Sequence, residues 1–118
     1  MYTYKAHIVR VLDGDTAEVN IKLGFDIEIT KKLRIIAENH EYFDTPESYR
    51  PKSEAERAHG KLATARAIEL LEGKDFVISS VKFGKYRYLG KITLENGEDY
   101  GDKMVNEGFQ KRDFYEED

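Results

Sequence analysis

The chain has 118 residues, 40% of them hydrophobic and 36% charged, which is typical of a single globular domain, residues 1–118, with a buried hydrophobic core. It contains no cysteine, so disulfide bonds and thiolate metal sites are excluded. The formal net charge of -4 argues against indiscriminate nucleic-acid binding through a basic face.

No run in the sequence approaches the ~18 apolar residues of a membrane span, and residues 1–5 lack the apolar stretch of a signal peptide. We therefore expect a cytoplasmic protein without membrane association, or a secreted one if a leader has been removed. We also expect a monomer. Residues 115–118 form an acidic tail that we expect to fray.

The first third of the chain alternates apolar and polar residues in the manner of β-strands. Ala17, Val19, Ile21 and Leu23 keep a period of two, and a similar but less regular pattern precedes them. Bends are expected at 13–14 and at Gly24, and a third strand should run from residue 27 to about residue 36. These features predict a three-stranded antiparallel meander.

A polar segment, residues 38–52, follows the meander and contains two prolines, so we predict a long loop, a kind of element that often carries function. Ser53 and Glu56 match a capping box, which predicts a helix from there to about Leu71. Gly73 stands where a left-handed helix cap is expected. The face of this helix that we expect to be buried consists of Ala58, Leu62, Ala65 and Ile68.

The last third predicts two strands, near residues 75–81 and 86–94, a turn at Asn96-Gly97, and a short helix over 102–106 that ends before Gly108. The order of elements is typical of an α+β protein. Five short strands with one main helix between the third and fourth strands, and a short C-terminal helix, predict an OB-fold-like five-stranded β-barrel.

Two acidic motifs stand out, Asp13-Gly14-Asp15-Thr16 and Asp44-Thr45-Pro46-Glu47, and each is followed by an arginine in a strand-like run, Arg34 and Arg87. Carboxylates can hold a hard divalent cation and activate water, and arginines can bind phosphate. Each motif also has a structural explanation: the first as a turn, the second as a helix cap, and each arginine as part of a solvated strand face.

Five segments, taken together and in order, resemble the staphylococcal (thermonuclease-type) nuclease family. They are Val11-Leu12-Asp13-Gly14-Asp15-Thr16, Leu33-Arg34-Ile35, Asp44-Thr45-Pro46-Glu47, Gly84-Lys85-Tyr86-Arg87-Tyr88-Leu89 and Met104-Val105-Asn106-Glu107-Gly108. The resemblance implies an OB-fold nuclease that cleaves DNA and RNA with calcium. We expect this nuclease to prefer single-stranded or frayed substrate.

The resemblance also implies roles for individual residues. Asp15, Asp44 and the backbone carbonyl of Thr45 would bind Ca2+, and Glu47 would orient or deprotonate the attacking water. Arg34 and Arg87 would clamp the scissile phosphate. The substrate groove would include Lys85 and Tyr86, with Phe114 or Tyr115 as a stacking aromatic.

The chain departs from the family pattern at two places. Nine residues, 35–43, separate Arg34 from the second acidic motif, which is longer than the family's usual spacing, and the glycine that usually precedes the second arginine is missing. These departures leave open an alternative function, a noncatalytic OB-fold module that binds nucleic acid or protein. A calcium-stabilised structural module would need only Asp15 and Asp44 and would leave the arginines unexplained.

Overall fold

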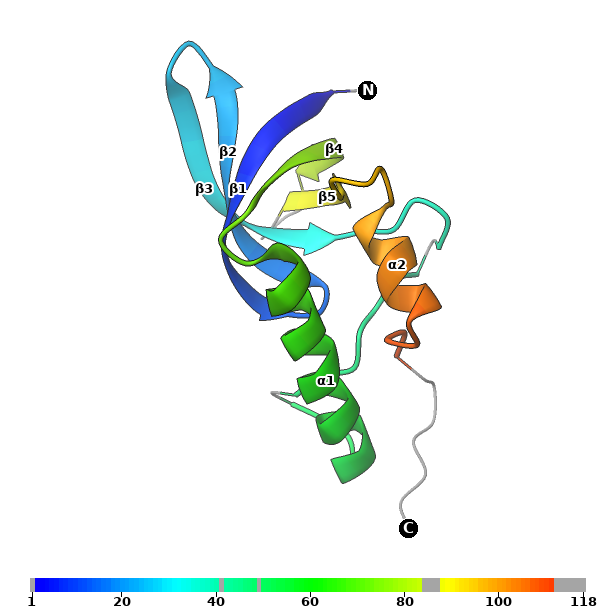
Figure 1. The fold of residues 1–118 in the computed structure, drawn as a ribbon. Coiled ribbons are helices and arrows are strands. Elements are labelled where there is room, and N and C mark those ends of the chain that lie inside the picture. Colours follow the sequence, from blue (N-terminus) through cyan, green and yellow to red (C-terminus); the bar gives the residue numbers. More distant parts are fainter. Residues whose placement is uncertain (1, 41, 49, 84–87, 112–118) are drawn as a thin grey trace.

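The computed structural model describes residues 2–40, 42–48, 50–83 and 88–111. The strands are β1 (Thr3–Asp13), β2 (Thr16–Gly24), β3 (Ile27–Ile35), β4 (Asp75–Phe83) and β5 (Tyr88–Thr93), and the helices are α1 (Glu54–Leu71) and α2 (Tyr100–Asn106). The strands close into a barrel in the order β1-β2-β3-β5-β4, with both helices packed outside it (Figure 1). The predicted α+β, OB-fold-like barrel is confirmed.

The barrel is built from the predicted meander and from one parallel contact. β1 pairs with β2, and β2 with β3, in antiparallel ladders, whereas β3 pairs in parallel with β5 from Leu33 opposite Tyr88 to Ile35 opposite Gly90. β1 and β4 close the other side. Residues of alternate positions point inward and form the core, because successive side chains of a strand face opposite sides.

A bulge in β1 explains why its apolar pattern is irregular. The register with β2 shifts between Ile8 and Arg10, so one extra residue, Val9, falls on the outer face and is 42% exposed. Val11 then returns to the core side and packs against it. Ile8 and Val11 therefore face the same side of the strand although they are three residues apart.

The helix α1 forms where the capping signal predicts it, but the prediction of its buried face was wrong. Leu62 is 62% exposed and Ile68 is 41% exposed, and Ala58 and Ala65 are exposed as well. The buried face consists instead of Glu56, Gly60, Ala63, Ala67 and Leu71. This face lies two residues along the sequence from the predicted one, which is about 200° around a helix with 3.6 residues per turn.

Small residues explain the choice between the two faces. A Cβ at Gly60 would lie 2.5 Å from the backbone carbon of Glu47, so the helix is in direct contact with the loop backbone. Larger side chains cannot fit between two backbones at this distance. The face with glycine and alanine packs inward, and the bulkier Leu62 and Ile68 stay outside.

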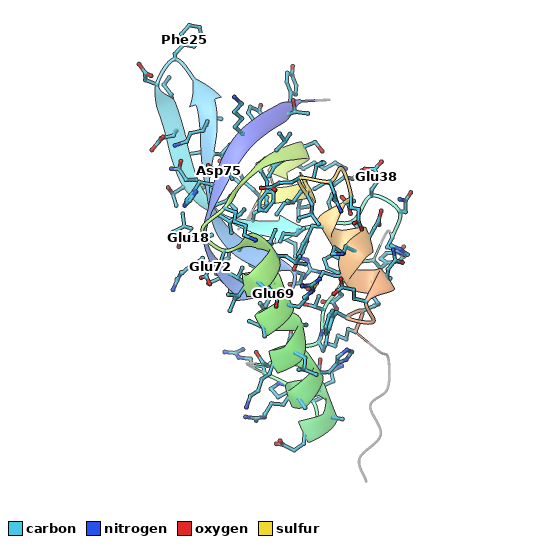
Figure 2. All side chains as sticks on the ribbon, in the orientation of Figure 1. Glu18, Phe25, Glu38, Glu69, Glu72 and Asp75 are labelled. Atoms are coloured by element: carbon cyan, nitrogen blue, oxygen red, sulfur yellow. The ribbon has the colours of Figure 1, made fainter. Side chains whose placement is uncertain are left out.

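The β2–β3 hairpin extends beyond the barrel and ends in a tight turn (Figure 1). Phe25 and Asp26 both have positive φ, 54° and 62°, a conformation that side chains other than glycine rarely adopt. Figure 2 shows the Phe25 ring at the tip, where it is 99% exposed. Among the described residues, no helix is long and apolar enough to cross a membrane.

Candidate active site

The turn between β1 and β2 brings the first acidic motif against the second. The Cβ of any other residue at Gly14 would lie 2.7 Å from the side chain of Thr45, so only glycine lets the two motifs pack this closely. The Tyr100 hydroxyl donates to the Gly14 carbonyl at 2.6 Å, and the Asp15 N–H donates to the Asp13 carboxylate at 3.1 Å. The turn is thereby fixed, and Asp15, which immediately precedes β2, is only 3% exposed.

The Asp15 carboxylate is surrounded by donors. It forms an ion pair with Arg34 and accepts hydrogen bonds from the Thr45 N–H at 2.9 Å and from the Thr16 hydroxyl at 3.0 Å. Burial alone would raise its pKa, but hydrogen bonding with Asp13 and the charge of Arg34 hold the pKa of Asp15 at about 2. Burial and the adjacent Asp15 raise the pKa of Asp13 to about 7. Asp15 therefore stays ionised at neutral pH.

Arg34 is placed by the register of β3. It pairs with Thr16, the residue after Asp15, and its two strand neighbours are fully buried, so its own side chain faces the opposite side of the sheet. There its guanidinium donates to the Phe43 carbonyl at 2.8 Å and lies 3.5 Å from the Asp44 carboxylate. With the Asp15 pair, Arg34 joins both acidic motifs, and its side chain is 19% exposed.

The long segment before the second motif does not carry that motif away from Arg34. Its first part is tied to the start of α2: the Glu38 N–H donates to Asp99 at 3.0 Å and the Asn39 N–H to Asp102 at 2.9 Å. The segment then returns to the barrel at Phe43, which is 3% exposed. The extra residues are thus accommodated in an outer loop, as a bulge ahead of the site.

Residues just after α2 hold Asp44 in place. The Asp44 N–H donates to the Gln110 side chain at 3.2 Å, and the Asp44 carbonyl accepts from the Lys111 N–H at 2.6 Å. Burial and the nearby Asp15 raise the pKa of the Asp44 carboxyl, against the opposing charges of Arg34 and Lys111. The cation that the two carboxylates share in the structure is the Arg34 guanidinium.

Glu47 is exposed, while its backbone is fixed. Its N–H donates to the Glu56 carboxylate at 3.2 Å, and its side chain borders a small cavity of about 160 Å3, lined by Leu12, Asp13, Glu47, Ser48 and Arg50. The cavity places Glu47 beside Asp13, whereas Asp15, Arg34 and Asp44 do not line it. A larger cavity of about 500 Å3, lined by parts of β1, β2 and β4 and by the end of β5 with the residues after it, contains none of the predicted site residues.

A comparison with known protein families finds a match for this chain. The model of the family described as staphylococcal nuclease homologue matches residues 42–118, well over half of the chain. The chain belongs to the staphylococcal nuclease family. The match includes the second acidic motif, whereas the structure adds Asp15 and Arg34, which lie before the matched residues. A comparison with curated proteins finds no match.

Membership of the staphylococcal nuclease family supports either a nuclease or an OB-fold module that binds nucleic acid. The donor atoms at the site suit calcium, which binds carboxylate, carbonyl and water oxygens in irregular geometry. Among the described residues, however, no group of three or more His, Asp or Glu side chains is arranged to hold a metal ion. The residues that fit calcium are the neighbouring carboxylates of Asp15 and Asp44, so an ion here would need the Thr45 carbonyl and water as further ligands.

Several predicted site residues of this nuclease-family chain fall outside the described residues: Lys85, Tyr86, Arg87, Phe114 and Tyr115. The consequence of the missing glycine before Arg87 stays a prediction for the same reason. The structure also adds residues that sequence reasoning missed, namely Glu56, Tyr100, Gln110 and Lys111. A weak signal existed for Glu56 alone, since a capping box places a carboxylate near free N–H groups.

Proposed function

We propose that this protein is a calcium-dependent nuclease that hydrolyses phosphodiester bonds of DNA or RNA, with a preference for single strands. The observation that supports it best is the position of Arg34 between the two acidic motifs, in contact with Asp15 and close to Asp44. A solvated strand face, the structural explanation for Arg34, would not bring it into this cluster. Family membership supports the same function.

In this proposal the ion is held by Asp15, Asp44 and the carbonyl of Thr45. Bound calcium would supply positive charge beside the scissile phosphate. Glu47, exposed at the cavity next to Asp13, would take a proton from the attacking water. The water oxygen forms the new bond to phosphorus, and the bond from phosphorus to the leaving ester oxygen breaks. The leaving oxygen takes a proton from solvent water, and Glu47 returns its proton to solvent.

Arg34 would contact the phosphate together with Arg87, which lies outside the described residues. A guanidinium has five N–H donors, more than the contacts of Arg34 with Asp15, Phe43 and Asp44 use. Arg34 can therefore keep its carboxylate partners and still donate to a phosphate oxygen. Fixed donors of this kind stabilise the charge that develops in the transition state.

The test is digestion of single-stranded DNA, duplex DNA and RNA with calcium and with chelator, using the wild type and Glu47→Gln. A matched control is Glu54→Gln, because Glu54 is a glutamate with an 86% exposed side chain in the first turn of α1. We expect calcium-dependent cleavage in the wild type and in the control, and a loss of about 10²-fold or more in Glu47→Gln, the size of effect that general-base catalysis supplies.

Cleavage that persists in chelator, or that survives the loss of Glu47, would defeat this mechanism. Salt-sensitive binding without cleavage would show instead a noncatalytic nucleic-acid-binding module, since contacts with phosphates weaken as salt rises.

A further inference from the structure

The carboxylate of Glu56 is fully buried and holds the loop that carries Glu47. Glu56 is 0% exposed, and its two oxygens face three donors. One oxygen accepts from the Lys52 N–H at 2.7 Å, and the other accepts from the Glu47 N–H at 3.2 Å and pairs with the Lys111 ammonium at 3.2 Å. A buried charge is costly unless it is paired and hydrogen-bonded, and here it is both.

Glu56 is itself held rigidly. It lies in the first turn of α1, where its N–H donates to the Ser53 hydroxyl at 3.1 Å. In an ordinary capping box the glutamate would bond back to the capping residue. Glu56 instead reaches past Ser53 to the backbone of Lys52 and of Glu47. The start of α1 is thereby connected to the candidate active-site loop.

A second contact holds the same loop one helical turn further on. A Cβ at Gly60 would lie 2.5 Å from the Glu47 carbonyl carbon and 2.6 Å from the Ser48 nitrogen, so the Glu47–Ser48 peptide rests directly on the helix. Figure 1 shows the chain between β3 and α1 running alongside α1. Glu47 is thus fixed on both sides of its Cα: its N–H is hydrogen-bonded to Glu56, and its carbonyl group packs against α1.

Lys111 connects this arrangement to the rest of the site. Its ammonium pairs with Glu56, and its backbone N–H donates to the Asp44 carbonyl. The two ends of the second acidic motif, Asp44 and Glu47, are therefore held by one connected set of contacts.

We propose that Glu56 is a positioning residue that sets the place of Glu47, an inference that rests on the nuclease function proposed above. Glu56 does this without touching the substrate. A charged side chain is required because three donors point at it. A glutamine would offer one acceptor oxygen and an NH2 group, which would leave donors unpaired.

The experiment compares kcat and KM for single-stranded DNA cleavage in the wild type, Glu56→Gln and the exposed control Glu54→Gln. We expect kcat to fall about 10- to 100-fold in Glu56→Gln, because small misplacements of a reacting group have costs of this order. KM should change by no more than about threefold, since substrate contacts stay in place. The control should match the wild type. Glu56→Asp, which keeps the charge but shortens the reach, gives a milder second variant if Glu56→Gln folds poorly.

A double variant shows whether Glu56 acts through Glu47. In a Glu47→Gln background, loss of Glu56 should cause no further fall in kcat, because the group that it positions is already gone. A further fall of about 10-fold or more in that background would overturn the proposal.

Hydrogen exchange provides a readout that does not depend on activity. The amides of Glu47 and Lys52 should exchange slowly in the wild type and faster in Glu56→Gln, while core amides stay protected. Lost protection with unchanged kcat overturns the positioning role alone. A wild type that does not cleave overturns the proposed function and, with it, the catalytic consequence of Glu56, even where the amides are protected.

Discussion

Gly60→Ala tests whether close packing of α1 on the loop is needed for activity. The added Cβ would lie 2.5 Å from the Glu47 carbonyl carbon, whereas ordinary contacts begin at 3.4 Å. The Glu47–Ser48 peptide must therefore retreat by roughly 0.9 Å, since backbone packed against backbone has no soft side chain to yield.

The stability change should be modest because two effects oppose each other. Overpacking costs about 1–3 kcal/mol, and replacing glycine by alanine within a helix recovers about 1 kcal/mol. We expect a net loss of about 0–2 kcal/mol in the free energy of unfolding, measured by denaturant titration. The nuclease rate should fall much more than this suggests, by about 10- to 100-fold, because the displaced peptide carries Glu47.

Gly101→Ala is the matched control. A Cβ there would lie 2.5 Å from the Cβ of Ala37, so the crowding is similar, but it occurs between α2 and the segment just after β3. Both variants should lose comparable stability, and only Gly60→Ala should lose most of its kcat on single-stranded DNA. A Gly60→Ala enzyme with wild-type kcat would refute the reasoning.

Three further outcomes are expected. Leu62→Ser should change the free energy of unfolding by no more than about 0.5 kcal/mol, because Leu62 lies on the exposed face of α1. Ala63→Leu should cost about 1–3 kcal/mol, because Ala63 is fully buried. Thermal melts with the reverse order of stabilities would contradict the observed helix face. Tyr100→Phe should cost about 1–3 kcal/mol, since the buried Gly14 carbonyl loses its donor, and a neutral melt would argue against that hydrogen bond. The third concerns pH: despite burial, hydrogen bonds from backbone N–H groups and the charge of Lys111 lower the pKa of Glu56 below its ordinary value of 4.5. Its contribution to stability should be complete above about pH 4.5 and lost as the pH falls below that, so Glu56→Gln should flatten the acid limb of the stability curve, and an unchanged limb would contradict this.

The part of the candidate site that lies within short sequence motifs could be predicted. Asp15, Arg34 and Asp44 were predicted as site residues from the family resemblance, and the structure brings their side chains together. The network behind them was not predictable, because the capping box signals only the local contact of Glu56 with Ser53 and Lys111 carries no local sign of its partners. Glu47 and Glu56 are separated by 9 residues in the sequence. Asp44 and Lys111 are separated by more than half of the chain.

The sequence by itself determined the elements of this protein. Period-two alternation, the serine cap before α1 and the glycine after it are local signals, since they reflect the geometry of a strand or a helix end. Local signals of this kind predicted five strands and two helices, and the order of these elements predicted the barrel.

Only the tertiary structure decided which face of α1 is buried and where the long loop before Asp44 goes. Both faces of α1 are apolar enough to be buried, so hydrophobicity alone does not distinguish them. The distinction comes from distance: the Glu47–Ser48 backbone lies so near the helix that even a Cβ at Gly60 would clash with it. This steric limit arises only where two segments pack against each other, so the buried face cannot be predicted from the sequence of the helix alone.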